Sequence, residues 1–319
     1  MSSHLRCAQS PSPLLRAGDG EATLYRKLTR PPRVSKHVQR LRPSKATAEQ
    51  MQAFPRSYPE AIRQAQQAVQ SALRDGAKLL EVEFPPASLE AVSGDAEGAN
   101  EMSYSMGFLR QFCRIFQDQA GSTRIFFPDD KELQLARQGS SRQHAGSEDD
   151  DGPVFGSTKF QLDFLTRPSI LGDIGLDFGK VKFPERVKPT DELFICAYPH
   201  FNVQEFLEIQ ELHRTVASQQ GQPIIVFNGE LDRMRGGYYP ALFYPKVAQA
   251  SREFLPLFER AFYIHNFKGS NPGALFRAYP GPWQVLRRGG RGSDDMQVVH
   301  TQADAPSLRE VSLDILSST

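Results

Sequence analysis

Residues 228–240 (NGELDRMRGGYYP) carry the residue types best suited to recognising another molecule. Two arginines offer fork-shaped donors that match carboxylates or phosphates, and the acidic residues offer acceptors. Two adjacent tyrosines supply large, stiff contact area with a polar end. The alternative is a self-contained loop whose arginines pair with its own carboxylates. The predicted binding residues are Asn228, Glu230, Asp232, Arg233, Arg235, Tyr238 and Tyr239.

Pairs of carboxylates elsewhere have the chemistry for acid–base work. Glu81 and Glu83 fall on one face of a predicted strand, because strand side chains alternate with a period of two. The pair Asp129–Asp130 follows another strand. Charges at strand ends are usually solvated, so we expect surface charge at these positions. Cys113 lies on the apolar face of a predicted helix, which indicates core packing and not a reactive thiol.

No complete catalytic or cofactor-binding motif is found in the sequence. The glycines at 172–175 and 289–292 lack both a strand-to-helix context and a Walker lysine, so we predict turns there. No G-x-S-x-G elbow seats a nucleophilic serine. His200 and His265 are interpreted as structural, and the acidic run 148–151 lacks the spaced ligands of a calcium loop. We predict no catalytic residue, no cofactor and no metal site.

Alternating strands and helices must position these residues. Strand followed by helix, repeated from residue 191 onward, predicts a three-layer α/β fold with a mainly parallel sheet and flanking helices. The last strands are close enough in sequence to form an antiparallel C-terminal edge. The predicted strands are 78–84, 123–127, 193–198, 223–227, 262–265, 274–278 and 283–286. The predicted helices are 59–75, one carrying Leu109, Phe112, Cys113 and Phe116, one from the cap Asn202 to Val216, and 246–260, bent by Pro256.

Composition limits the setting in which this fold works. Basic residues number 38 and acidic residues 37, which argues against binding nucleic acid through general phosphate attraction. Three widely spaced cysteines indicate a reducing compartment. No run approaches the roughly 18 apolar residues that a membrane span needs. The sequence therefore predicts a soluble protein or one bound peripherally to a membrane.

The chain divides into three kinds of segment. Residues 1–50 are basic, rich in serine and poor in acids, which predicts a transit peptide, with a disordered basic tail as the alternative. Residues 139–153 contain no aliphatic or aromatic side chain larger than alanine, so we predict a disordered acidic insert. The remainder, 54–316, is predicted to form one α/β domain.

Several stretches resemble the family labelled domain of unknown function 1995. They are FICAYPHFNVQEF (194–206), PIIVFNGELDRMRGGYYPALFYPK (223–246) and FYIHNFKGSNPGALFRAYPGPWQVLRR (262–288), and the resemblance extends over about residues 54–316. Its most recognisable turn contains Arg277, Tyr279, Pro280, Pro282 and Trp283. We interpret this turn as fixing an aromatic side chain into the core, since proline presets the backbone and glycine permits the bend. Direct contact with a partner is the alternative.

The resemblance implies a non-enzymatic assembly factor for photosystem II. It implies a chloroplast protein of the stroma that associates peripherally with the thylakoid membrane. There it would assist incorporation of a chlorophyll-binding inner antenna subunit together with the thylakoid insertase. An alternative from another class is a nucleotide- or metabolite-binding plastid enzyme or regulatory domain, because the family domain also resembles a region attached to some plastid adenylate kinases. The missing phosphate loop argues against that alternative.

Overall fold

The computed structural model of this chain describes residues 51–86, 89, 91, 99–138, 155–166, 182–200, 202–289 and 296–318. The predicted leader at 1–50 and the predicted acidic insert at 139–153 lie outside the described residues.

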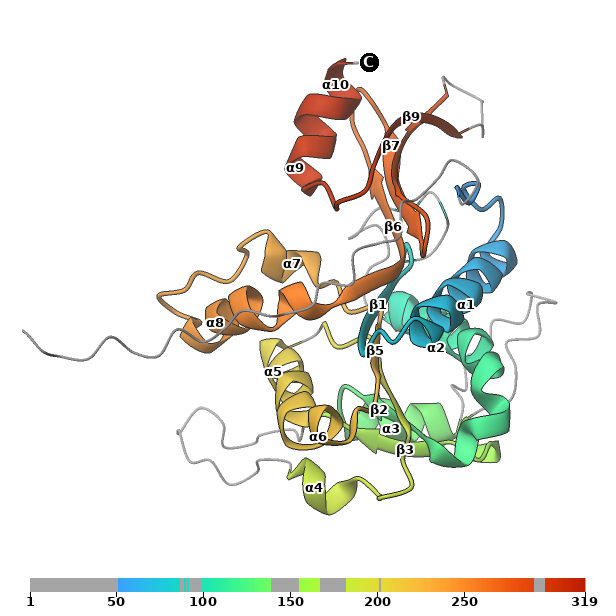
Figure 1. The fold of residues 1–319 in the computed structure, drawn as a ribbon, viewed down its shortest axis with the longest axis vertical. Coiled ribbons are helices and arrows are strands. Elements are labelled where there is room, and N and C mark those ends of the chain that lie inside the picture. Colours follow the sequence, from blue (N-terminus) through green and yellow to red (C-terminus); the bar gives the residue numbers. More distant parts are fainter. Residues whose placement is uncertain are drawn as a thin grey trace, which may run out of the picture. The chain divides into compact units, whose positions relative to one another are not determined.

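Nine strands of the described chain form one sheet in the order β3-β2-β4-β5-β1-β6-β7-β8-β9 (Figure 1). The first six in that order pair in parallel, and β6 to β9 pair antiparallel. The predicted mainly parallel sheet with an antiparallel C-terminal edge is therefore confirmed. The strands are β1 Leu79–Glu83, β2 Thr123–Phe127, β3 Gln161–Phe164, β4 Leu193–Ala197, β5 Ile224–Phe227, β6 Glu259–Phe267, β7 Gly273–Ala278, β8 Trp283–Arg288 and β9 Met296–Gln302.

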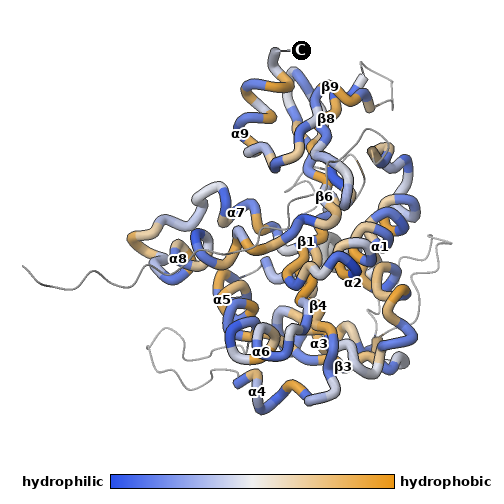
Figure 2. The backbone as a smooth tube through the Cα atoms, viewed as in Figure 1, coloured by the Kyte–Doolittle hydropathy of each residue, from blue (hydrophilic) through white to orange (hydrophobic). Residues whose placement is uncertain are grey.

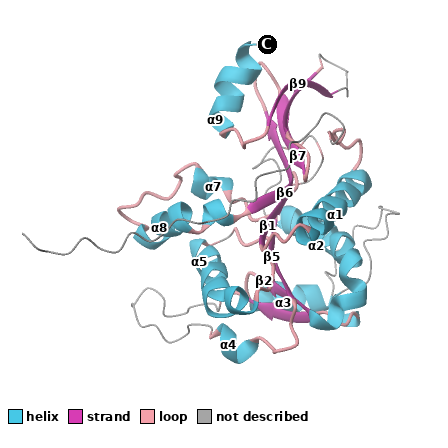
Figure 3. Ribbon diagram, in the orientation of Figure 1, coloured by secondary structure: helices cyan, strands magenta, loops and turns pink. Residues whose placement is uncertain are grey.

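Helices flank the sheet on both sides, with α1 and α2 to the right of the strands in Figure 1 and α5 and α8 to the left. The helices are α1 Tyr58–Arg74, α2 Ala99–Cys113, α3 Asp130–Gln138, α4 Phe183–Arg186, α5 Val203–Leu212, α6 Ser218–Gln220, α7 Asp232–Arg235, α8 Pro245–Glu253, α9 Leu308–Glu310 and α10 Leu316–Ser318. Further 3-10 or π-helical turns lie at Arg114–Ser122, Phe155–Ser157, His213–Ala217, Leu255–Leu257 and Val311–Ile315. Figure 3 separates these elements by type.

Alternation along the strands divides the core into two layers. In β1, Leu80 and Val82 face the cluster that contains the buried sides of α1, α2 and α3, whereas Leu79 joins the cluster beneath α5 and α8. A third cluster, around Tyr263 and Trp283, is closed by the C-terminal helical segment. Strand β4 is drawn orange in Figure 2 because its residues are apolar, and every one of them is buried.

The predicted helix boundaries on the N-terminal side of α1 and α5 have visible causes. Ser57 caps α1 by accepting a hydrogen bond from the Glu60 amide, and Asn202 caps α5 by accepting from the Gln204 amide at 2.9 Å. After α1 the chain turns at Gly76, whose φ of 89° lies in the left-handed region that glycine adopts without a steric penalty.

One predicted helix was wrong in its extent. The segment 246–260 was expected to be one bent helix, but α8 ends at Glu253 and β6 begins at Glu259. Pro256 has no amide hydrogen with which to continue the α-helical hydrogen bonds. The chain passes through a single 3-10 turn, Leu255–Leu257, and then enters the sheet, so β6 gains its first residues from what the apolar pattern assigned to a helix.

The structure also contains two edge strands that the sequence patterns do not predict. Strand β3 is short, and β9 has a largely exposed burial pattern along its seven residues. An edge strand with few buried residues carries only a weak alternation of apolar and polar side chains. Both strands form because a neighbouring strand offers a free hydrogen-bonding edge.

Candidate functional site

The connections of the sheet reverse direction at the carboxyl ends of β1 and β5, which pair side by side. The next described helix after β1 is α2, on the face that α1 covers, whereas after β5 the chain passes to α7 and α8 on the opposite face. Neighbouring strands whose connections leave to opposite faces open a crevice, and α/β proteins commonly place ligand sites there. The predicted binding segment 228–240 begins at this crevice.

Asn228 anchors the start of that segment to the neighbouring strand. Its Oδ1 accepts a hydrogen bond from the backbone amide of Phe84 at 2.9 Å, and its own amide donates to the Val82 carbonyl at 2.8 Å. Its φ of 49° lies in the left-handed region, which asparagine tolerates better than most residues. Because the residue is buried, it positions the segment from the interior instead of lying on the predicted surface.

Both arginines of the segment pair with acids of the same segment, as the self-contained alternative proposes. Arg233 contacts Glu230 at 2.5 Å, and Arg235 contacts Asp232 at 3.1 Å. Arg235 also reaches outside the segment. Its guanidinium forms a two-pronged contact with Glu81 of β1, with one Nη1–Oε1 distance of 2.8 Å. Arg235 therefore holds the segment against strand β1 of the sheet.

Glu81 is a buried charge, so its expected place at the surface was wrong. The residue has no exposed area, and its carboxylate faces Arg235 and, at 3.7 Å, Nε of Arg260. A carboxylate can be buried when cations and hydrogen bonds replace its water. The two guanidiniums come from segments far away in the sequence, which is why period-two spacing alone gave no sign of them.

This ion-pair network continues to the aromatic turn near the C-terminus. Tyr263 donates a hydrogen bond from its hydroxyl to Asp232, and its ring packs edge-on against Trp283 with centroids 5.3 Å apart. The Arg260 guanidinium lies 5.1 Å from the centre of the Trp283 ring, within range of a cation–π contact. Two stretches singled out from the sequence, the binding segment and the aromatic turn, thus meet in one network.

The turn itself holds Trp283 in the interior, where only 2% of the residue is exposed. Arg277 packs over the same ring at 5.4 Å and donates to the Gly281 carbonyl at 3.2 Å, which ties both ends of the turn together. Tyr279 precedes a cis peptide bond to Pro280 and donates to Asp75 at 2.8 Å. Pro280 and Pro282 are partly buried.

A cavity of about 230 Å³ opens beside this network at the end of β1. Three acidic side chains, one guanidinium, one imidazole and one amide form its polar lining, and proline, aliphatic and phenylalanine side chains form the rest of the wall. The lining residues are Glu83, Phe84, Pro85, Pro86, Ala91, Glu230, Asp232, Arg233, Ile264, His265, Asn266 and Leu308. This size is near the lower end for pockets that hold small organic ligands.

Two titratable groups in the lining have displaced pKa values. Burial raises the pKa of Glu83 well above its ordinary value, and the nearby negative charges of Glu81, Glu230 and Asp232 add to the effect. The hydrogen bond that Glu83 accepts from the Glu230 amide, at 3.2 Å, opposes it only in part. Burial lowers the pKa of His265, so its imidazole is neutral near pH 7. The ionised form of Glu83 is thus disfavoured in this cavity, and a bound cation would stabilise it.

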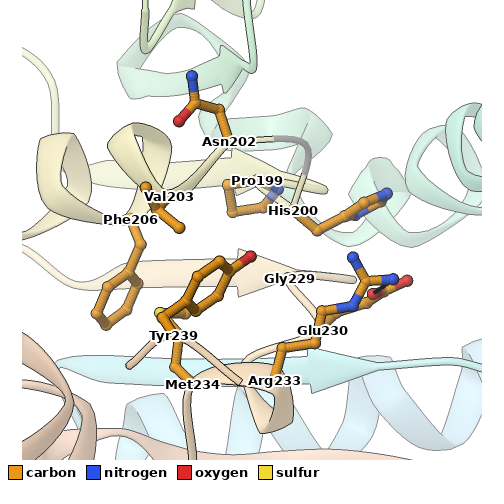
Figure 4. Close-up of a pocket in the computed structure, with 10 residues that line it drawn as sticks. All are labelled: Pro199, His200, Asn202, Val203, Phe206, Gly229, Glu230, Arg233, Met234 and Tyr239. Atoms are coloured by element: carbon orange, nitrogen blue, oxygen red, sulfur yellow. Dashed lines mark ion pairs between the residues drawn. The ribbon is translucent and has the colours of Figure 1, made fainter. Parts of the chain in front are cut away.

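A second, smaller hollow lies on the other side of the segment (Figure 4). Tyr239 lies across it with Phe206 and Val203 of α5 nearby, and the ion pair of Glu230 with Arg233 closes one end. At about 10 Å³ it holds no more than a water molecule. This hollow therefore shows how Tyr239 anchors the segment, since the ring packs against the core beneath α5 and α8.

The stretch around Tyr239, residues 238–244, exposes several large apolar side chains, and we call it the apolar loop. Tyr238 is 71% exposed, Leu242 84% and Phe243 74%, and Tyr244 is also exposed. The stretch that leads into α8 appears orange in Figure 2. Soluble surfaces seldom gather so many apolar side chains unless something binds them. Sequence reasoning predicted Tyr238 but missed Leu242 and Phe243, whose only signal was an apolar run between two prolines with no assigned element.

Three further features of the described residues concern metal ligands, thiols and membrane spans. No group of three or more histidine, cysteine or acidic side chains is arranged there to hold a metal ion. The two cysteines described are buried, and burial raises the pKa of both thiols. None of the described helices combines the length and apolar character needed to cross a bilayer.

Fold and site together define an open α/β protein with a crevice at the carboxyl edge of its sheet. Residues 55–313 match a family described as a domain of unknown function, DUF1995. The chain belongs to this family, because the match spans most of its length. No curated protein and no solved structure is significantly similar to it.

Proposed function

We propose that this chain is a non-enzymatic assembly factor for photosystem II. In this role it would bind a chlorophyll-binding inner antenna subunit, together with the thylakoid insertase, from the stromal side of the membrane. Within the family it would be the counterpart of low PSII accumulation protein 3. The proposal rests on the resemblance of residues 54–316 and, in the structure, on one observation: the exposed apolar loop.

The apolar loop suits a partner made of apolar helices. Its side chains stand in solvent, while Tyr239 and Tyr244 brace its base through ring contacts with centroids 5.4 Å apart. A braced loop loses less conformational entropy on binding than a free one, so more of the contact energy appears as affinity. A transient complex with a membrane subunit needs such an apolar anchor, and peripheral association with the thylakoid follows from the same contact.

The nucleotide-binding alternative receives less support from the site. The crevice where such a ligand would lie is lined by Glu83, Glu230 and Asp232, which repel phosphate groups. The guanidiniums of Arg233 and Arg235 are already paired with carboxylates. A small cationic ligand fits that lining better than a nucleotide does.

Affinity purification from isolated chloroplasts tests the assembly role. The tagged full chain is expressed, crosslinked and recovered from solubilised thylakoids, and photosystem II subunits and the insertase are quantified. The double variant Leu242→Ser with Phe243→Ser is expected to lower their recovery at least tenfold, because each apolar anchor is worth about 1.5–3 kcal/mol when buried.

The matched control is Leu135→Ser, which removes an apolar side chain that is 45% exposed on α3, on the opposite face of the sheet. Its recovery of partners should equal that of the unaltered chain. The assembly role is wrong if the unaltered chain recovers no photosystem II subunit and no insertase. If the double variant recovers as much of these partners as the unaltered chain does, the apolar loop is not the surface that binds them.

A further inference from the structure

We propose that the cavity at the end of β1 binds a primary ammonium group, carried either by a small amine or by a lysine side chain. The cavity is the one lined by Glu83, Asn266 and the acids of the binding segment. This inference concerns a ligand site and does not depend on the proposed assembly role.

The first support is an imbalance of charge among the carboxylates. Glu81 has two guanidinium partners, and Glu230 and Asp232 have one each. Among the described residues, no arginine, lysine or histidine lies within ion-pair distance of Glu83, although it lines the cavity. Its only hydrogen bond to a described group comes from the amide of Glu230. A carboxyl group without a cation therefore faces an open space.

The second support is a buried acceptor without a donor. Asn266 is 4% exposed and lines the same cavity. Its Nδ2 donates to the carbonyls of Leu89 at 2.8 Å and Ala91 at 2.7 Å, which fixes the side-chain amide with Oδ1 as the remaining acceptor. Oδ1 has no partner among the described residues. Leaving a buried acceptor unpaired is unfavourable, and a ligand donor would remove that cost.

These two groups select the chemistry of the ligand. An ammonium group has three donors and no acceptor, so it complements a carboxylate and an amide oxygen together. An anion would meet three carboxylates and is excluded by repulsion. A metal ion is disfavoured because the described acids do not converge on one point. Pro85, Pro86 and Leu308 supply apolar wall for the methylene groups that carry the amine.

Binding is linked to protonation, because burial and the neighbouring acids raise the pKa of Glu83 and a bound cation would lower it again. An ammonium ligand then displaces the proton, and affinity should rise with pH until the free carboxyl is itself ionised. Several charged or titratable groups face Glu83. They are Glu81 on β1, Glu230 and Asp232 on the binding segment, and Arg233 and His265, which line the same cavity. Arg235, Arg260 and Tyr263 lie one contact further away, against Glu81 or Asp232.

Calorimetric titration of the full chain provides the test. Putrescine and N-acetyl-lysine methylamide serve as the two amine probes, and 1,4-butanediol serves as the uncharged match for putrescine. At least one amine is expected to bind saturably with Kd below about 1 mM, and the diol is expected to give no saturable heat. Which amine binds distinguishes a free amine from a lysine side chain. Repeating the titration in phosphate and HEPES buffers, neither of which carries a primary amine, should reveal the released proton.

Variants and spectroscopy connect binding to this cavity. Glu83→Gln keeps the acceptor for the Glu230 amide but removes the charge, and should weaken amine binding at least tenfold. Glu185→Gln, an acid whose side chain is 70% exposed on α4, should leave it unchanged. In the unaltered chain, the ring signals of His265 should shift on titration while those of exposed His300 stay constant.

The proposal is overturned if neither amine saturates below about 10 mM, if the diol binds as well as putrescine, or if Glu83→Gln binds like the unaltered chain. The double variant in the apolar loop separates this proposal from the assembly role. It should retain amine binding in full, because Leu242 and Phe243 do not line the cavity.

Discussion

Glu81 and Glu83 are two residues apart on one strand and share one face, yet their environments differ. The first is paired in the interior with the guanidiniums of Arg235 and Arg260. The second faces a cavity and meets mainly negative neighbours, so its pKa is raised. The same amino-acid type thus forms buried ion pairs at one position and lines a cavity at the other. The difference comes from the side chains that the rest of the fold places near each carboxyl group.

Replacing Glu81 tests the buried ion pairs. Glu81→Gln keeps the size of the side chain but leaves Arg235 and Arg260 without their shared counter-charge. Breaking a buried pair in this way should lower the free energy of unfolding by about 3 kcal/mol, measured by urea denaturation. Glu211→Gln is the control, since its partner Arg214 is exposed and the change should cost less than about 0.5 kcal/mol. Equal costs would show that the Glu81 network adds no stability of its own.

Glu83 should make stability depend on pH with a definite sign. The folded-state pKa of Glu83 lies above the ordinary value near 4.5. At pH values between the unfolded-state and folded-state pKa, the folded chain therefore binds more protons than the unfolded chain. The contribution of Glu83 is therefore fully present below about 4.5 and is lost as pH rises through the raised folded-state pKa. Relative to Glu83→Gln, the unaltered chain should become less stable between pH 5 and pH 8. Parallel urea-denaturation profiles for the two proteins would contradict the raised pKa.

At the scale of elements, short-range backbone preferences set where helices end. Helix α1 ends because Gly76 takes up a left-handed conformation, and α8 ends ahead of a proline. In both cases a local steric rule acts within a few residues. The apolar periodicity predicts helical regions well. In 246–260, however, the periodic pattern continues past Pro256, so the predicted end of the helix was placed too late in the sequence.

Gly76→Ala tests the first of these endings. Space is available for the added methyl group, since nothing lies within 4 Å of it, but φ of 89° is unfavourable for alanine. Thermal unfolding should therefore show a loss of about 1 kcal/mol. Gly121→Ala is a matched control, because it also meets no neighbour within 4 Å and its φ is not positive. A similar loss in both variants would point to chain entropy or propensity instead of backbone strain.

At the scale of the molecule, the sheet brings two distant stretches into contact. Strands β5 and β6 lie on either side of β1, so the segment after β5 meets Tyr263 on β6, and β7 and β8 then carry the aromatic turn to the same network. The central strands are buried on both faces, while β9 at one edge is largely exposed.

This arrangement predicts a gradient of protection against amide hydrogen exchange. Amides of β1, β4 and β5 should exchange only through global unfolding, because both faces and both hydrogen-bonding edges of these strands are covered. Amides of β9 should exchange fastest among the strands. Mass-spectrometric exchange on the full chain measures this order, and equal protection of β9 and β4 would contradict it.

Much of the architecture was determined by the sequence alone, because strand and helix periodicities are local. The parallel core, the antiparallel edge, the cap at Asn202 and the segment 228–240 all follow from residues within a few positions of one another. The edge strands β3 and β9 and the end of α8 were not predicted from the sequence. The two strands depend on pairing with a neighbouring strand, and the helix end depends on a proline that outweighs the apolar periodicity.

Only the tertiary structure decided what the candidate residues do. Arg235 meets Glu81 across 154 positions, and Asn228 meets Phe84 across 144. No local pattern records such pairs. Burial of Asn228 and exposure of Leu242 and Phe243 are equally properties of the folded chain, as is the lack of a described cation within ion-pair distance of Glu83. These long-range contacts, absent from any single stretch of sequence, divide the predicted segment into an anchored base, an acidic cavity wall and an apolar loop.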